Sequence, residues 1–147
     1  MALFEAAFHH VGISVRDMEK TKDFYCNTLG FSVVWAHKER TGKPLQNVVG
    51  LPDAVMDISM LEGYGMRIEL FKYIIPEGRD LGPVRQCDFG LIHIALKVKD
   101  ARAVYTMLVD KGVQFNSPPQ DLRPGVVAVY LRDPEGNTIE IMENNVD

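Results

Sequence analysis

This sequence of 147 residues has few cysteines, a single tryptophan and no excess of basic residues. The two cysteines, Cys26 and Cys87, are too few for a disulfide framework or a thiolate zinc cage. Sixteen lysines and arginines against twenty acidic residues give a net charge of -4, which leaves no basic field for a nucleic-acid backbone. No apolar run approaches the roughly 20 residues that span a bilayer, and Glu5 interrupts any N-terminal signal core. We therefore expect a cytoplasmic protein that binds neither nucleic acid nor membrane.

An internal repeat divides the chain into two similar halves. The segment HVGISVRD at 10–17 recurs as HIALKVKD at 93–100, and each copy leads from a strand into a helical pattern. The last strands of the two halves also contain similar tripeptides, IEL at 68–70 and IEI at 139–141. Each half is therefore predicted to consist of a strand, a helix and three further strands.

Both predicted helices carry start and stop signals at equivalent places. Asp17 and Asp100 can cap the first free amides of their helices. Gly30 and Gly112 follow the last turns, where a left-handed residue is favoured. The predicted helices cover residues 17–29 and 100–111.

The hydrophobic content of 46% and the charged content of 24% are typical of one soluble domain, here 1–147. We predict an α+β fold of two βαβββ modules, at approximately 8–75 and 90–143. The turn formers at 76–83 join the modules in a segment too short for a domain boundary. Within the first module, residues 40–44 are expected to break a strand and residues 62–65 to turn a hairpin.

Strand alternation predicts which side chains lie on the sheet face away from the helices. In each strand the aliphatic residues define the packing face, and four chemically functional residues fall on the other face. These residues are His10, Glu69, His93 and Glu140. Any one of them alone would more often be an ordinary polar strand residue. Because each module supplies one His at its first strand and one Glu at its last, we predict a shared metal site.

Asp57 is a further candidate on the same face. Met56, Ile58 and Met60 make an apolar face along their strand, and this alternation predicts that Asp57 lies on the cavity side with Glu69. There it could act as an acid or base. A merely polar residue on a partly exposed strand is an equally open interpretation.

Two stretches of the sequence match the opening and closing patterns of a known family. The opening residues are HVGISV at 10–15, FY at 24–25 and LGF at 29–31, and the closing residues are DPEGNTIE at 133–140. With these motifs the chain resembles, from residue 8 to 143, the vicinal-oxygen-chelate superfamily. That group contains glyoxalase I, methylmalonyl-CoA epimerase, fosfomycin-modifying enzymes, extradiol dioxygenases and bleomycin-resistance proteins. The resemblance implies two modules forming a cupped mixed sheet with the helices outside.

The resemblance also implies a site and a chemistry. One divalent metal ion (Zn, Ni, Co, Mn or Fe) would be held by His10, Glu69, His93 and Glu140, as in the His/Glu/His/Glu set of glyoxalase I. Methylmalonyl-CoA epimerase is similar, with Gln where Glu69 stands. We expect an isomerase or lyase that moves a proton at a carbon beside a carbonyl, with Glu140 as the catalytic base and Glu69 or Asp57 as a second base. The substrate would be an acyl thioester, a hemithioacetal or a similar small molecule, and the protein a homodimer.

Two alternatives stay open at this point. An Fe(II)-dependent extradiol dioxygenase needs only two His and one Glu, and Tyr130 matches the tyrosine of its closing pattern. The His that precedes this tyrosine in dioxygenases is missing here, because residues 120–124 read QDLRP. The third reading is a small-molecule binding or antibiotic resistance module. Such proteins have generally lost the metal ligands, which this sequence keeps.

Overall fold

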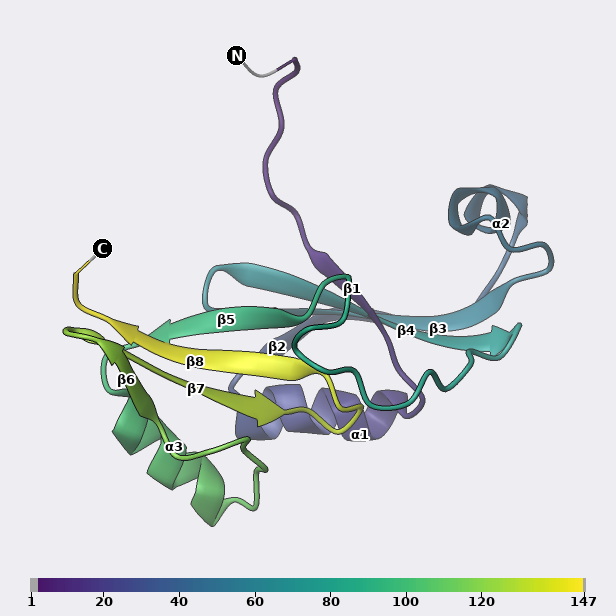
Figure 1. The fold of residues 1–147 in the computed structure, drawn as a ribbon. Helices are drawn as coiled ribbons and strands as arrows, with labels where there is room; N and C mark the ends of the chain where they lie inside the picture. The colour runs from purple at the N-terminus through teal and green to yellow at the C-terminus, as the bar shows by residue number, and fades with distance from the viewer. Residues whose placement is uncertain (1–2, 147) are drawn as a thin grey trace. The chain divides into compact units, whose positions relative to one another are not determined.

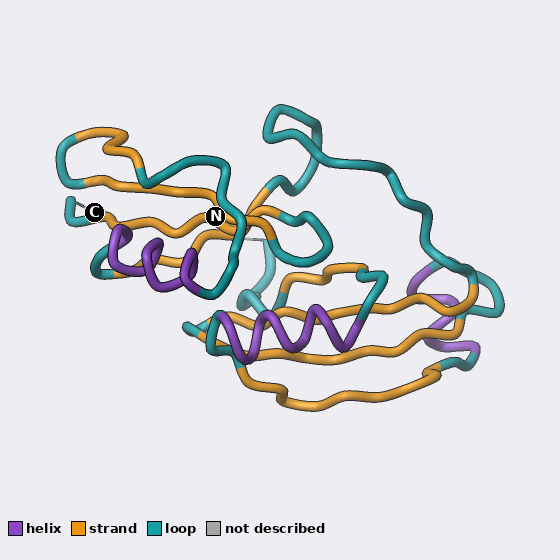
Figure 2. Tube along the Cα trace, turned by 90° about the horizontal axis from the view of Figure 1, so that it is seen from below, coloured by secondary structure: helices purple, strands orange, loops and turns teal. Residues whose placement is uncertain are grey.

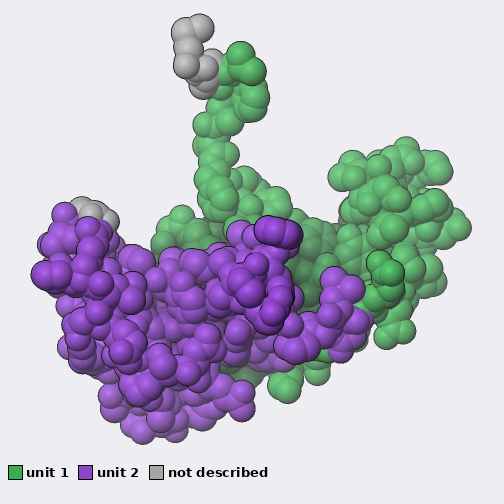
Figure 3. All heavy atoms as spheres, viewed as in Figure 1, with its two compact units in different colours: residues 1–79 green, residues 80–147 purple. Residues whose placement is uncertain are grey.

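A computed structural model describes residues 3–146 of the chain, and it divides between Arg79 and Asp80 into two compact units (Figures 1 and 3). Each unit contains one βαβββ module and one four-stranded mixed sheet. The predicted α+β fold class is therefore confirmed, whereas the grouping of both modules into one domain stays a prediction. Within residues 3–146, no helix is long and apolar enough to cross a membrane.

The first unit builds its sheet in the order β1-β4-β3-β2, with β1 parallel to β4 and the other pairs antiparallel. Its strands are β1 (Val11–Ser14), β2 (Ser32–Arg40), β3 (Val55–Gly63) and β4 (Met66–Ile75). Its helical segments are α1 (Met18–Asp23), a π-helical turn (Phe24–Thr28) and α2 (Lys43–Val49). Helices α1 and α2 lie on opposite sides of this sheet (Figure 1).

The second unit repeats the pattern in the order β5-β8-β7-β6, with β5 parallel to β8. Its elements are β5 (His93–Val98), α3 (Ala101–Asp110), β6 (Gln120–Arg123), β7 (Val126–Arg132) and β8 (Thr138–Asn144). In both units a helix runs along one face of its own sheet (Figure 2). That face is apolar, and its fully buried members include Ile68 and Leu70 in the first unit and Ile139 in the second.

The predicted helix caps are confirmed. The Asp17 side chain accepts a hydrogen bond from the amide of Lys20 at 3.0 Å, and the Asp100 side chain accepts one from Ala103 at 2.9 Å. The first helix continues from α1 into the π-helical turn, so the helical segment ends at Thr28 and not at residue 29.

Two turns in the first module also follow the prediction, but one element was missed. Strand β2 ends at Arg40, and the hairpin between β3 and β4 turns through Tyr64 and Gly65. Helix α2 was not predicted. It has a proline in its first turn and ends at Val49, and its C-cap Gly50 has a left-handed φ of 68°.

The glycines that end the two repeated helices allow a matched stability test. Gly30 and Gly112 have φ values of 85° and 81°, so alanine at either position is expected to cost about 1 kcal/mol. A Cβ at Gly30 would also lie 2.9 Å from the Tyr64 hydroxyl, which donates to the Leu29 carbonyl, whereas a Cβ at Gly112 meets nothing within 4 Å. Chemical denaturation should therefore show a loss about 1 kcal/mol larger for Gly30→Ala than for Gly112→Ala.

The tyrosine hydroxyl can be removed to isolate its part in this difference. In a Tyr64→Phe background the extra cost of Gly30→Ala should shrink, because the clashing oxygen is gone. Equal losses of stability for both glycine variants in the unmodified background would contradict the explanation.

Candidate metal centre

The first module brings His10 and Glu69 together at the edge of its sheet. Strand β1 runs parallel to β4, and Gly12 lies directly opposite Glu69 in their register. His10 precedes β1, two residues before Gly12 and hence on the same face. Its Nε2 lies 2.9 Å from Oε2 of Glu69, and the two side chains are 33% and 15% exposed. A Cβ at Gly12 would lie 3.4 Å from the ring of Phe71.

The second module repeats this arrangement with His93 and Glu140. Ala95 of β5 lies directly opposite Glu140 of β8, and His93 again stands two residues before that small residue. The His93 Nε2 is 3.2 Å from Oε2 of Glu140, and the side chains are 27% and 7% exposed. The same offset in both modules places an imidazole nitrogen against a carboxylate oxygen. We call these the His10/Glu69 pair and the His93/Glu140 pair.

The predicted position of Asp57 is wrong. In the register of β3 and β4, Met60 lies opposite Glu69 and Asp57 lies opposite Lys72. Directly opposed residues share a face, so Asp57 is on the other side of the sheet from Glu69. Its carboxylate accepts a hydrogen bond from the amide of Glu39 at 2.8 Å, which anchors an irregular stretch of β2.

The error has a physical cause, because β3 is buried on both faces. Ser59 and Leu61 are buried on the side of Asp57, while Met56 and Met60 are buried on the side of Glu69. Other apolar side chains, several of them from α2 and the residues after it, cover the end of β3 on the Glu69 side. They are Trp35, Leu45, Val49, Leu51, Phe71 and Tyr73. An apolar series on one face therefore does not identify the helix side of such a strand.

A tyrosine accompanies the carboxylate of each pair. Tyr73 lies on the face of Glu69, and Tyr130 of β7 lies directly opposite Glu140 with its ring centroid 5.1 Å from that of His93. Burial, and then the nearby Glu69 or Glu140 carboxylate, raises the pKa of both phenols above its usual value. Both tyrosines therefore keep their O–H proton at neutral pH, which makes them hydrogen-bond donors beside the pairs.

The closing motif DPEGN has a structural role in placing Glu140. The Asp133 carboxylate accepts hydrogen bonds from the backbone amides of Glu135 and Asn137 at 2.9 and 2.8 Å, and from the Asn137 side chain at 3.0 Å. These bonds close a tight turn immediately before β8 begins at Thr138. The turn therefore fixes the register of the β7–β8 hairpin, in which Tyr130 lies directly opposite Glu140.

Sequence reasoning missed a polar group around the second pair. Thr138 lies directly opposite His93, and its hydroxyl accepts hydrogen bonds from Gln86 Nε2 and from Arg132 Nη1, each at 2.6 Å. No local pattern marks Gln86, which lies in the long loop before β5 and reaches a threonine 52 residues further along the chain.

The predicted ligands are of kinds that suit a first-row divalent ion, since each pair offers an imidazole nitrogen and a carboxylate oxygen. In the described part of the chain, no three His, Cys, Asp or Glu side chains form one potential metal site. Each unit by itself brings together two of the four predicted ligands.

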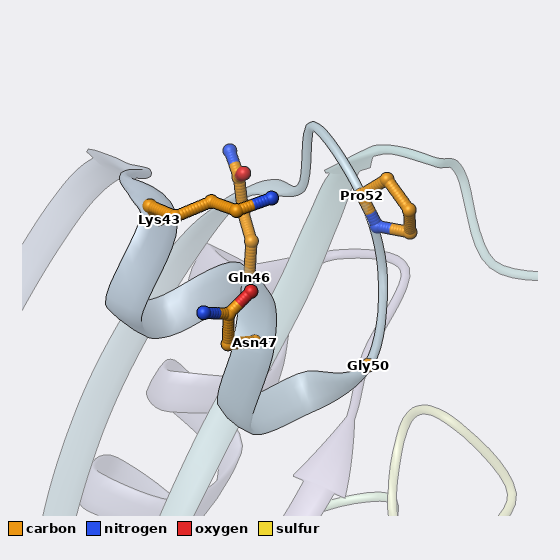
Figure 4. A pocket seen from close by; sticks show the side chains of 5 residues that line it. All are labelled: Lys43, Gln46, Asn47, Gly50 and Pro52. Carbon is orange, nitrogen blue, oxygen red and sulfur yellow. The ribbon is translucent and has the colours of Figure 1, made fainter.

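A separate depression lies on α2 and does not include any predicted site residue. Its volume is about 400 Å³, and it is lined by Lys43, Gln46, Asn47, Gly50 and Pro52 (Figure 4). Neither a carboxylate nor an imidazole is among these residues. The predicted site residues therefore lie outside this depression.

A family model decides the affiliation of the chain. The model of the glyoxalase/bleomycin resistance protein/dioxygenase superfamily matches residues 7–141. The chain belongs to this superfamily. Members of the superfamily typically bind a divalent metal ion, and many are enzymes. The resemblance inferred from the opening and closing motifs is thus confirmed for the superfamily as a whole.

The curated relatives of this chain are distant but match over most of their length. The uncharacterized protein YwkD of Bacillus subtilis is 28% identical over 138 residues, which are 93% of this chain and 96% of that protein. A probable lactoylglutathione lyase of Synechocystis is 27% identical over 137 residues, which are 92% and 94% of the two chains.

Solved structures of the superfamily have the same fold. A glyoxalase family protein from Bacillus cereus matches with a TM-score of 0.86 at 20% identity, covering 99% of each chain. The fosfomycin resistance protein FosX from Mesorhizobium loti matches with a TM-score of 0.62 at 16% identity, covering 97% of this chain and 94% of that one. The protein therefore has the vicinal-oxygen-chelate fold.

Proposed function

We propose that this protein is a divalent-metal-dependent isomerase or lyase that moves a proton at a carbon next to a carbonyl group. The observation that supports the proposal is a duplicated arrangement, in which each unit holds an imidazole Nε2 and a carboxylate oxygen 2.9 or 3.2 Å apart. The Synechocystis relative, a probable lactoylglutathione lyase, favours the same class of chemistry.

Four residues would hold the ion, which would be Zn, Ni, Co, Mn or Fe. They are His10, Glu69, His93 and Glu140. We propose that both pairs serve one ion and that the protein is a homodimer. When bound, such an ion supplies Lewis-acid stabilisation of the negative charge that develops on substrate oxygens. A substrate with two chelating oxygens, such as an acyl thioester or a hemithioacetal, fits this role.

Glu140 is the residue that we propose as the general base. The Glu140 side chain is 7% exposed, so few water molecules can hydrogen-bond to its carboxylate and occupy the place of the substrate. The Glu140 carboxylate would take the proton from the carbon beside the carbonyl and return it to the neighbouring carbon. Epimerisation needs a second base on the opposite side of the carbon, and Glu69 is our candidate for that step.

Hydrogen exchange with solvent tests the proposed reaction. The metal-loaded protein is incubated in D₂O with a 2-substituted acyl thioester or with a hemithioacetal. Deuterium is expected at the carbon beside the carbonyl of the recovered compound or at the product carbon, because a carboxylic acid exchanges its proton with water. Mass spectrometry detects the label. A variant with both His10→Ala and His93→Ala should give none. Absence of both label and product with every candidate ion and both substrate classes would contradict the proposal.

A second candidate function is an Fe(II)-dependent extradiol-type dioxygenase. The observation that favours it is Tyr130, whose phenol lies next to the His93 ring and opposite Glu140. Oxygen uptake with Fe(II) and catechols would support this function over proton transfer. A protein that binds such compounds without turnover would instead be a small-molecule binding or resistance module.

A further inference from the structure

We propose that Gln86 is a positioning residue that keeps the Nδ1 of His93 protonated, so that Nε2 is available to a metal ion. The inference rests on the metal-binding role proposed above for His93. Two buried polar atoms carry it, namely Oε1 of Gln86 and Nδ1 of His93. Both lack a hydrogen-bond partner in residues 3–146. A buried polar atom without a partner typically costs about 1–3 kcal/mol, so two such atoms in one cluster require an explanation.

The two atoms belong to side chains that meet at the same threonine. Gln86 donates a hydrogen bond from Nε2 to the Thr138 hydroxyl at 2.6 Å. Thr138 lies directly opposite His93 in the register of β8 and β5, on the same sheet face. The amide of Gln86 is therefore tied to the residue beside the His93 imidazole.

The unpaired atoms are complementary in only one form of the neutral imidazole. The Gln86 Oε1 is an acceptor and cannot donate. The His93 Nδ1 is a donor when it carries the ring hydrogen, and Nε2 then has the free lone pair that a metal requires. A hydrogen bond from Nδ1–H to Oε1 would satisfy both buried atoms. Ligating histidines usually donate their other ring N–H to such an acceptor.

The hydrogen bond from Gln86 to Thr138 determines which end of the amide faces the imidazole. The Thr138 hydroxyl oxygen also accepts a hydrogen bond from Arg132 Nη1 at 2.6 Å. With the Gln86 nitrogen committed to this oxygen, the amide carbonyl is the end left for the ring. The opposite amide orientation would present N–H groups to Nδ1 and would favour the form in which Nε2 holds the hydrogen.

The first module offers a matched control, because His10 has a different neighbour. Its Nδ1 lies 2.7 Å from Nδ1 of His9. Replacing His9 should therefore disturb His10 and leave His93 unchanged, whereas replacing Gln86 should do the reverse.

Nitrogen NMR of the histidine side chains tests the proposal on the full-length protein. In the Zn²⁺-loaded wild type, the His93 ring is expected to show a slowly exchanging Nδ1–H. In Gln86→Leu this proton should exchange at least about tenfold faster, and the Kd for Zn²⁺ should rise by about 10–100-fold, as expected for a lost partner of a ligand. Gln86→Glu should keep slow exchange, because a carboxylate still accepts from Nδ1–H. His9→Ala should leave the His93 signals in place.

Metal-free protein separates this inference from the proposed function. The doubly protonated imidazole also carries the Nδ1–H, so this hydrogen of His93 can be observed in acidified protein without metal. Protection in the wild type and its loss in Gln86→Leu would support the hydrogen bond even if no ion binds. The inference is overturned if the exchange rate is the same in both proteins, or if Gln86→Glu behaves like Gln86→Leu while all variants keep the wild-type circular dichroism spectrum.

Discussion

Alanine at His10 or at His93 is expected to raise the Kd for Co²⁺ or Zn²⁺ by on the order of a hundredfold or more. Losing a hydrogen-bond partner of a ligand already costs about 10–100-fold in metal affinity, and losing the ligand itself should cost at least as much. Isothermal titration calorimetry measures both the Kd and the number of ions per chain. His37→Ala is the matched control, because that exposed imidazole belongs to neither pair.

The number of ions decides whether the two pairs act together. If both pairs hold one ion, the wild type binds one per chain and either substitution removes that site. If the pairs act separately, the wild type binds two ions and each single substitution leaves one site intact. Two ions per chain, or unchanged affinity in both variants, would contradict the shared site.

The single tryptophan reports whether the ion binds near Glu69. Trp35 of β2 lies opposite Met60 of β3, which lies opposite Glu69 of β4. Two steps between neighbouring strands, of about 4.8 Å each, put the Trp35 backbone roughly 10 Å from that of Glu69. Co²⁺ held at Glu69 is therefore expected to quench Trp35 fluorescence, and His10→Ala should abolish the quenching at the same concentration. Persistent quenching in that variant would place the ion elsewhere.

The strands that carry the pairs were predictable because each has one apolar series and functional residues between its members. Alternation places His10, just before β1, and His93, in β5, on the face opposite the aliphatic residues, and the structure brings each imidazole against its carboxylate. The repeat helped further, since the equivalent positions of Glu69 and Glu140 are readable from IEL and IEI. Strand alternation and comparison of the two halves were sufficient to predict these four residues.

Asp57 and α2 were not predictable by the same means. An inner strand such as β3, with side chains buried on both faces, gives no local sign of which face is which. Only the pairing of Met60 with Glu69 decides it, and pairing depends on the whole sheet. The missed helix α2 supplies the cover that makes the second face apolar, but with seven residues it offers too few turns for a periodic signal. Gln86 was missed because its partner Thr138 is remote in the sequence.

Replacing Glu140 by glutamine is expected to lower turnover by on the order of a hundredfold or more, measured at saturating metal. The amide has nearly the same size as the carboxylate, so packing against His93 and Tyr130 should persist, but an amide cannot accept the substrate proton. Steady-state kinetics with a hemithioacetal would give kcat, and circular dichroism would check the fold.

Glu69→Gln separates loss of the base from loss of a charged ligand. It makes the same chemical change in the equivalent pair of the first module. If Glu140 alone is the base, Glu69→Gln should weaken metal binding but keep most of the wild-type kcat once metal is saturating. The kcat of Glu140→Gln should stay low even at saturating metal. Two-base epimerisation of an acyl thioester requires both carboxylates, so both variants should then lose turnover. Near-normal kcat for Glu140→Gln with both substrate classes would remove that residue from the reaction, because a base that can be replaced by an amide does not carry the proton.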